Sequence, residues 1–293
     1  MTYFLQQFVN GLSIGAQYSL WCVGYGLVYQ VLGLMHFAHG DTLIFSAFFA
    51  ATLMVLGVPF WLVVVAAMAL AAVLAICIER AIYRPLMSRN QLFMAFIAAM
   101  AAGFILRNLV QRFWGVQPRV FPEGLLPSGS IMIGEIRIGH LALMNLAVAI
   151  VIVVAFQLFL NRSRHGQAIL AVSQDRSTAE LMGIKVNRIV ALVYGLSGAI
   201  GMVGVFMYIT SFRTITIGLG FLITLKAFIA AIIGGIGSIR GAVLGGMVLG
   251  VLEAMVSAYL STTLLEAIVV VCLVAFLIVR PNGIVGIKES VKL

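Results

Sequence analysis

Apolar segments long enough to cross a membrane follow one another along nearly the whole of this 293-residue chain. Only 9% of the residues are charged, against about 25% in an average soluble protein, so polar side chains are too few to cover a water-facing surface. At about 20 residues per span, the sequence predicts an all-α polytopic membrane protein of about eight or nine transmembrane helices. A soluble enzyme, a secreted disulfide scaffold and a disordered chain are excluded. The expected spans are about 5–32, 41–57, 60–79, 91–110, 141–160, 189–211, 219–236, 242–259 and 263–280.

Neither redox chemistry nor catalysis has a visible basis in the sequence. Cys22, Cys77 and Cys272 lie within apolar segments, which indicates small buried side chains and not a disulfide framework or a metal site. No Walker-type phosphate loop, zinc-protease motif or dinucleotide fingerprint occurs. We therefore expect a chain without catalytic residues, cofactor or metal, which needs another subunit for energy if it pumps. No cleavable leader is evident, so we expect the first helix to be retained.

Basic residues are distributed unevenly between the two sides of the predicted bundle. Cytoplasmic loops retain Lys and Arg, so the net charge of +9 indicates membrane orientation and not nucleic-acid binding. The bias predicts an outside amino terminus and an inside carboxyl terminus for a single transmembrane domain, 1–293. The residues expected inside are Arg80, Arg84, Arg89, Arg162, Arg164, Arg176, Lys185, Arg188, Arg240, Arg280, Lys288 and Lys292.

Fewer basic residues are expected on the outer side or at its interface: Arg107, Arg112, Arg119, Arg137 and Arg213. Arg213 would lie at the outer mouth, where it meets a substrate carboxylate or a docking partner, or is simply solvated. The outer connection, about 114–140, is long enough for structure of its own. Its stretch at 131–138 predicts a small hairpin, which we interpret as a packed cap in preference to a partner contact.

The inner connection, about 161–188, predicts a short helix that projects from the membrane. Asp175 is a suitable N-cap, and Gly183 can adopt the left-handed conformation that ends a helix. Arg176, Glu180 and Leu181 lie between them. A short capped helix of this kind has a shape that a partner's groove can grip.

Glycine-dense segments mark close helix crossings or helix breaks in a membrane protein. One segment contains Gly33 and Gly40, and a second contains Gly234, Gly235, Gly237 and Gly241, so that each has glycines seven residues apart. The shared spacing suggests an internal duplication, although glycine spacing also recurs by chance. We expect these glycines to act in packing or as hinges.

Five polar residues are expected at membrane depth, where polar groups face protein or a water-filled cavity. His36, His39 and Asp41 lie where the first helix region is broken. A metal site, a proton relay and a place in the translocation path are the alternatives there, but no further ligand cluster accompanies these residues, so hydrogen bonding of a broken helix is favoured. Lys226 and Glu253 lie within the seventh and eighth spans, where they form a structural ion pair or line the translocation path.

Four separated motifs, in the same order, resemble the branched-chain amino-acid ABC transporter permease family, in its LivH branch. They are residues 33–41, residues 164–168 continuing through 174–184, residues 234–246 and residues 280–286. The resemblance spans nearly the whole chain. Two departures stand out, because His36 occupies a position where asparagine is expected and Arg240 one where proline is common.

The resemblance implies a non-catalytic permease subunit of a bacterial inner-membrane importer. Its implied partners are a second, LivM-like permease, two cytoplasmic ATPase subunits that bind ATP and Mg, and a periplasmic binding protein that delivers the substrate. It also implies that Asp175, Arg176, Glu180, Leu181 and Gly183 transmit ATPase closure to the membrane helices. The implied substrates are branched-chain or other hydrophobic amino acids, while related branches import urea, short amides or aromatic acids. A stand-alone ion-coupled carrier is the alternative in kind.

Overall fold

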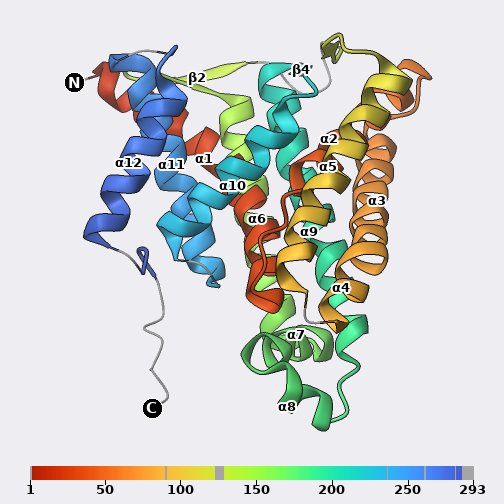
Figure 1. Cartoon of the computed structure of the whole chain (residues 1–293). Coiled ribbons are helices and arrows are strands. Elements are labelled where there is room, and N and C mark those ends of the chain that lie inside the picture. Colours follow the sequence, from red (N-terminus) through yellow and green to blue (C-terminus); the bar gives the residue numbers. More distant parts are fainter. Residues whose placement is uncertain are drawn as a thin grey trace.

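A computed structural model describes residues 2–89, 91–122, 129–235, 237–260, 262–280 and 282–285. Within these ranges the chain forms nine long helices that pack into one bundle (Figure 1). They are α1 (Thr2–Leu32), α2 (His39–Val55), α3 (Phe60–Ile78), α5 (Leu92–Trp114), α6 (His140–Arg162), α9 (Val186–Phe212), α10 (Leu219–Gly234), α11 (Ile239–Tyr259) and α12 (Leu265–Val279). Lys288, Lys292, part of the 280–286 motif and residues 123–128 of the outer connection lie outside the described residues.

The expected all-α polytopic membrane architecture is confirmed. Five helical segments are long and apolar enough to cross a membrane, namely those at Phe60–Ser88, Leu92–Trp114, His140–Arg162, Val186–Phe212 and Ile239–Tyr259. Three shorter apolar helices, α2, α10 and α12, complete the set, and the expected break after the first helix lies at residues 33–38.

The connection expected around residues 80–90 is largely helical, so that prediction was wrong. A π-helical turn, η1 (Glu79–Tyr83), joins α3 to α4 (Arg84–Ser88). The extra residue in a π turn rotates the next helical segment, and both Glu79 and Tyr83 are buried at this turn. Arg84 folds back and donates two hydrogen bonds to the Glu79 carboxylate, at 3.1 and 3.0 Å. Arg84, one of the charged residues that suggested a loop, therefore forms an ion pair with Glu79 within one continuous helical segment.

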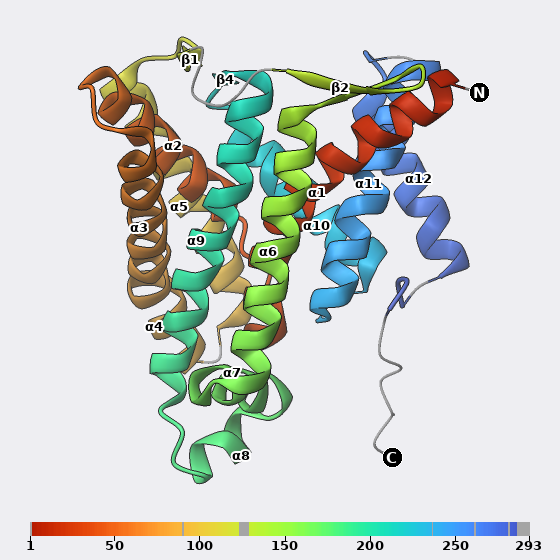
Figure 2. The same cartoon turned by 180° about the vertical axis from the view of Figure 1, so that it is seen from behind.

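The helices α1, α2 and α3 correspond to the helices α9, α10 and α11, and the two groups run in opposite directions. Helix ends recur at an offset of 180 residues: α1 ends at Leu32 and α9 at Phe212, while α2 begins at His39 and α10 at Leu219. α1 packs on α9 and α11, and α9 packs correspondingly on α1 and α3. Because α1 begins at the face that carries the hairpin and α9 at the opposite face (Figure 2), the repeat is inverted. The two glycine-rich segments do not correspond in it, because one follows α1 and the other follows α10.

Small strands cover the face where α1 begins. The expected hairpin is confirmed, with β2 (Ser130–Ile133) paired antiparallel to β3 (Ile136–Gly139). The side chain of Gln6 exchanges two 2.8 Å hydrogen bonds with the backbone of Arg137, which fastens the hairpin to α1. A second pair, β1 (Arg119–Val120) and β4 (Thr214–Ile215), links the ends of α5 and α9.

Candidate functional site

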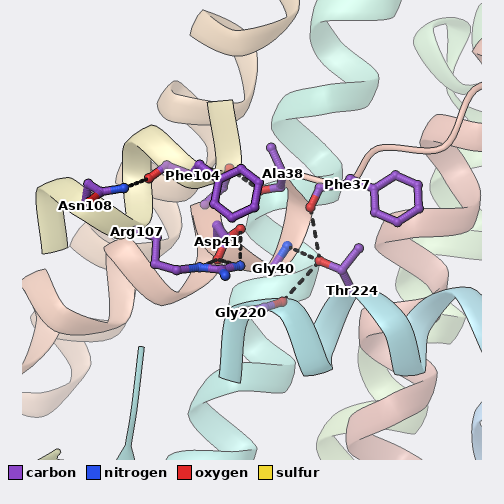
Figure 3. A network of polar contacts seen from close by, with 10 residues as sticks. Phe37, Ala38, Gly40, Asp41, Phe104, Arg107, Asn108, Gly220 and Thr224 are labelled. Atoms are coloured by element: carbon purple, nitrogen blue, oxygen red, sulfur yellow. Dashed lines mark hydrogen bonds and ion pairs between the residues drawn. The ribbon is translucent and has the colours of Figure 1, made fainter. Parts of the chain in front are cut away.

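Two of the shorter apolar helices, α2 and α10, called the half-helices from here on, meet at their amino-terminal turns at buried positions inside the bundle (Figure 3). The first turn of α2 touches the first turn of α10, and a β-carbon at Gly40 would overlap the carbonyl oxygen of Gly220. The hydroxyl of Thr224 accepts a 2.9 Å hydrogen bond from the Gly40 amide and donates to the Gly220 carbonyl at 3.1 Å. Glycine at both crossing points therefore permits the contact.

Asp41 lies at this junction and pairs with Arg107 of α5. The Arg107 guanidinium donates to both Asp41 carboxylate oxygens at 3.0 to 3.2 Å, and its charge lies over the Phe104 ring at 5.3 Å. The carboxylate also faces the amino-terminal turns of α2 and α10, whose dipoles favour negative charge. A β-carbon at Gly103 would lie 2.6 Å from the carboxylate, so this glycine provides its space. Arg107, expected at the outer side, has its side chain turned into the bundle.

His36 and His39 do not join Asp41 in one cluster. Their rings lie 5.9 Å apart, and the Nδ1 atom of His36 is 3.0 Å from the Tyr83 hydroxyl. The Nδ1 atom of His39 lies 3.4 Å from the Ser197 hydroxyl. Among the described residues, no three His, Cys, Asp or Glu side chains are arranged to hold a metal ion.

Lys226 and Glu253 form the expected ion pair, with 3.0 Å between the ammonium and a carboxylate oxygen. The Tyr18 hydroxyl donates to the same Glu253 oxygen at 2.6 Å and accepts from Lys226 at 3.0 Å. Glu266, half-exposed at the start of α12, lies 3.5 Å from the ammonium. Sequence reasoning missed Tyr18 and Glu266, because neither has a local pattern that indicates its partner.

The inner connection contains two helices, α7 (Arg164–Gln174) and α8 (Arg176–Leu181). The predicted cap is present: the Asp175 carboxylate accepts hydrogen bonds from the amides of Ser177 and Thr178 at 2.9 and 3.1 Å. Hydrogen bonds from Thr178, followed by those from Ser177, hold the pKa of Asp175 below its ordinary value. Gly183 has φ +84°, as the predicted helix end requires.

α8 rests on a second helix that the sequence did not predict. α7 is capped by Ser163, whose hydroxyl accepts from the Gly166 amide at 2.9 Å, and it buries Ile169 and Val172 against the bundle. At the tip of α8, the side chains of Leu181 and Met182 are 89% and 79% exposed. Arg176 and Glu180 are exposed on the same helix, and the role of this group in coupling stays a prediction.

The remaining glycines fall into packing and turn positions. Gly234 and Gly241 lie backbone to backbone where α10 turns into α11, and Gly33, Gly235 and Gly237 have positive φ. The chain after α12 crosses this turn, with the Ile284 and Val285 amides donating to the carbonyls of Ile233 and Gly234 at 2.9 and 3.0 Å.

A Gly-x-Ser-x-Gly pattern at residues 11–15 lies inside α1. Gly11 and Gly15 pack against α11, where a β-carbon on either would come within 2.7 Å of the Cα atom of Val251 or Met247. The two glycines therefore serve close packing of α1 on α11. In hydrolases with this motif the serine nucleophile lies on a sharp turn between a strand and a helix, and not inside a helix.

Arg213 follows the last turn of α9 in the left-handed conformation, with φ 57°. Its carbonyl accepts from the Phe121 amide at 2.8 Å, which places it beside the β1–β4 pair. A role for Arg213 at the mouth or in docking stays a prediction.

The inverted repeats, the paired half-helices and the capped helix that projects from one face define a polytopic membrane transport subunit. The chain belongs to the family described as the permease component of the branched-chain amino acid transport system, whose model matches residues 7–279.

Several proteins resemble this chain over nearly its whole length. It is 34% identical to the high-affinity branched-chain amino acid transport system permease protein LivH of Escherichia coli K12, over 99% of this chain and 98% of the relative. It is also 34% identical to the permease protein BraD of Pseudomonas aeruginosa, with the same coverage. A solved structure, PsaBC from Streptococcus pneumoniae in complex with Fab, has a TM-score of 0.51 at 16% identity, covers 94% of this chain and 90% of its own, and shows the fold alone.

Proposed function

We propose that this chain is a permease subunit of an ATP-driven importer in a bacterial inner membrane, and that it takes up branched-chain or other hydrophobic amino acids. A second permease would complete the translocation path, two ATPase subunits would supply energy, and a periplasmic binding protein would deliver the substrate. The family match and the relatives named for branched-chain amino acid transport support the substrate class.

The exposed tip of α8 is the observation that carries the proposal. Leu181 and Met182 are large apolar side chains held in water on a helix fixed by its cap, which is costly unless a partner covers them. α7 connects that tip to α6 and α9, so a push on α8 reaches the membrane helices through packed contacts. An ATPase subunit with an apolar groove is the partner we assign to this surface.

Charge supports the orientation. Arg162, Arg164, Arg176, Lys185 and Arg188 all lie on or beside the α7–α8 projection. Because cytoplasmic loops retain basic residues, this face would be cytoplasmic and the hairpin face periplasmic. The amino terminus of α1, fastened to the hairpin, would then be outside, and the end of α12 would be inside.

Vesicle uptake tests the proposal directly. The chain would be purified with the proteins that co-isolate with it and reconstituted, and the uptake of labelled leucine, urea and benzoate would be measured with and without ATP on the α8 side. Leucine uptake that needs ATP, a second permease, the ATPases and the binding protein is expected. Uptake of only urea or benzoate would overturn the substrate and keep the architecture, whereas gradient-driven uptake by the isolated chain would contradict the whole proposal.

A further inference from the structure

A polar cavity opens between α1, α6, α7 and α11 on the side of the bundle that carries α8. Its volume is about 160 Å³. The lining residues are Gln30 of α1, Gln157, Leu160 and Asn161 of α6, Leu170 of α7, and Ser238, Ile239 and Arg240 at the start of α11. Five of these side chains are polar and none is a carboxylate, so the cavity favours a negative group over a cation.

Arg240 supplies the positive charge of this cavity. Its side chain is exposed, so a molecule outside the bundle can reach it. The described part of the chain offers its guanidinium no carboxylate partner. Arg162 follows Asn161 in the chain, and Arg164 begins α7, so further positive charge adjoins the lining residues in sequence. Phosphate suits this donor set, because a guanidinium can donate two parallel hydrogen bonds to it and amide side chains can donate more.

An apolar crevice adjoins the polar cavity and shares Gln30, Ser238 and Ile239 with it. From Gln30 it follows α1 back to Val23, about 10 Å toward the middle of the membrane at 1.5 Å per residue. It is narrow, with a volume of about 10 Å³, so it can take the edge of a flexible hydrocarbon chain and not a bulky ring. Gly26 keeps it open, since a β-carbon there would have no atom within 4 Å.

We propose that the cavity and the crevice together bind an anionic phospholipid from the leaflet on the α8 side. Its phosphate lies at Arg240, and one acyl chain lies along the crevice beside Gly26. A polar hollow that continues into an apolar one matches a molecule with a charged head and a hydrocarbon tail, whereas a free phosphate would leave the crevice uncovered. Basic pockets between membrane helices recognise anionic headgroups in this way. The orientation proposed above makes this the cytoplasmic leaflet, but binding does not depend on it.

A lipid at this position would link the α8 projection to the second repeat. Leu170 lies on α7, which supports α8, and Arg240 lies on α11, so one bound molecule would contact both helices. Amide exchange across α7 measures this link and should slow when phosphatidylglycerol is added. Exchange that does not respond would show that the lipid does not restrain α7.

Native mass spectrometry tests the binding itself, with the assembly purified in an uncharged detergent and stripped of lipid. Phosphatidylglycerol and phosphatidylcholine with identical acyl chains would be titrated separately. We expect phosphatidylglycerol to bind at least about fivefold more tightly, the ratio expected from one basic residue near a membrane surface. Equal Kd values for the two lipids would overturn the proposal.

Removal of single charges locates the site. Arg240→Gln should raise the Kd for phosphatidylglycerol about fivefold and abolish the preference over phosphatidylcholine. Arg188→Gln is the matched control, because it removes the same charge from an exposed position at the start of α9, on the same side of the bundle, and lines neither hollow. Equal losses in the two variants would show attraction by overall charge and contradict a site at Arg240.

The crevice distinguishes a lipid from a free anion. Gly26→Leu fills it without meeting other atoms at the β-carbon, so this variant should keep its Tm and bind phosphatidylglycerol more weakly. Inorganic phosphate at the same concentration as the lipid should not displace phosphatidylglycerol from the unmodified protein. Displacement by inorganic phosphate, or an unchanged Kd in Gly26→Leu, would assign the cavity to a free anion and overturn the lipid.

Discussion

The α2–α10 junction and the α7–α8 projection hold their polar residues by opposite means. At the junction, Asp41 is buried, pairs with Arg107 and packs against Gly220, and both of these residues come from helices distant in sequence. On the projection, Asp175 is exposed, and its partners Ser177 and Thr178 are two and three residues away. The junction depends on tertiary packing and the projection on local capping.

This difference separates stability from coupling. Changes at the junction should unfold or loosen the bundle, because they leave charges or backbone groups unmatched in a low-dielectric interior. Changes on the projection should leave the bundle intact and alter only the motion that α8 transmits. Four substitutions, in order of decreasing effect on stability, can break or sharpen the distinction.

The largest loss is expected for Asp41→Asn, which removes the charge that Arg107 faces. Breaking a buried pair costs about 3–5 kcal/mol, and the lower end applies because Arg107 is 24% exposed. Thermal unfolding in detergent would measure it. The double variant Asp41→Asn with Arg107→Met should recover part of the loss. Equal stabilities for the single variant and the unmodified protein would show that the junction does not depend on this pair.

Lys226→Met should destabilise somewhat less, because Glu253 keeps its hydrogen bond from Tyr18. The expected cost is below the roughly 3 kcal/mol expected for Asp41→Asn, because the unmatched buried charge of Glu253 is partly compensated by that hydrogen bond. Glu266→Gln is the control: its carboxylate is half-exposed, so its loss should cost at most about 1 kcal/mol. Normal stability and transport in Lys226→Met would show that the bundle does not need this ion pair.

Gly40→Ala comes third, because its β-carbon would overlap the Gly220 carbonyl, and backbone cannot move aside as a side chain can. Overpacking of this kind costs about 1–3 kcal/mol. Gly26→Ala, also in a helix but with no atom within 4 Å of its added carbon, should be neutral. Equal melting temperatures for the two variants would argue against close contact between the half-helices.

Asp175→Ala should leave the melting temperature of the bundle unchanged and reduce ATP-driven uptake. Its measurable structural effect is faster amide exchange across residues 176–181, since α8 loses its cap. Asp175→Asn should restore both readouts, because asparagine also caps helices. Because the pKa of Asp175 is lowered, its carboxylate is ionised at every pH above the ordinary pKa of aspartate. Uptake should therefore not lose this cap between about pH 5 and 8. Unchanged uptake and exchange in Asp175→Ala would remove the coupling assignment.

Features set by neighbouring residues could be predicted from the sequence. Apolar length indicated the nine helices, and alternation and turn residues indicated the β2–β3 hairpin. The Asp175 cap and the Gly183 turn follow from rules that operate within one helical turn. The pairing of Lys226 with Glu253 was accessible for a different reason, because few charges lie at membrane depth and each needs a partner.

Features set by long-range packing were missed. Nothing near Arg107 indicates Asp41, which is 66 residues away, and nothing near His36 indicates its contacts with Tyr83 and Tyr194. The repeat was sought in glycine spacing, whereas it lies in helix ends at a constant offset. A single sequence shows where polar groups must be satisfied, but the fold decides by which partner.

The chain segment that crosses the α10–α11 turn gives α12 a second attachment to α10. Near its start, Glu266 faces Lys226 of α10, and beyond its end the Ile284 and Val285 amides bond to the last residues of the same helix. α12 is thus tied to α10 at both ends, while Val271, Val274 and Ile278 on the same helix are exposed. A tilt of α10 at the junction would be carried to the outer surface by α12, so the surrounding bilayer would experience each transport cycle as a change in the contour of these exposed side chains.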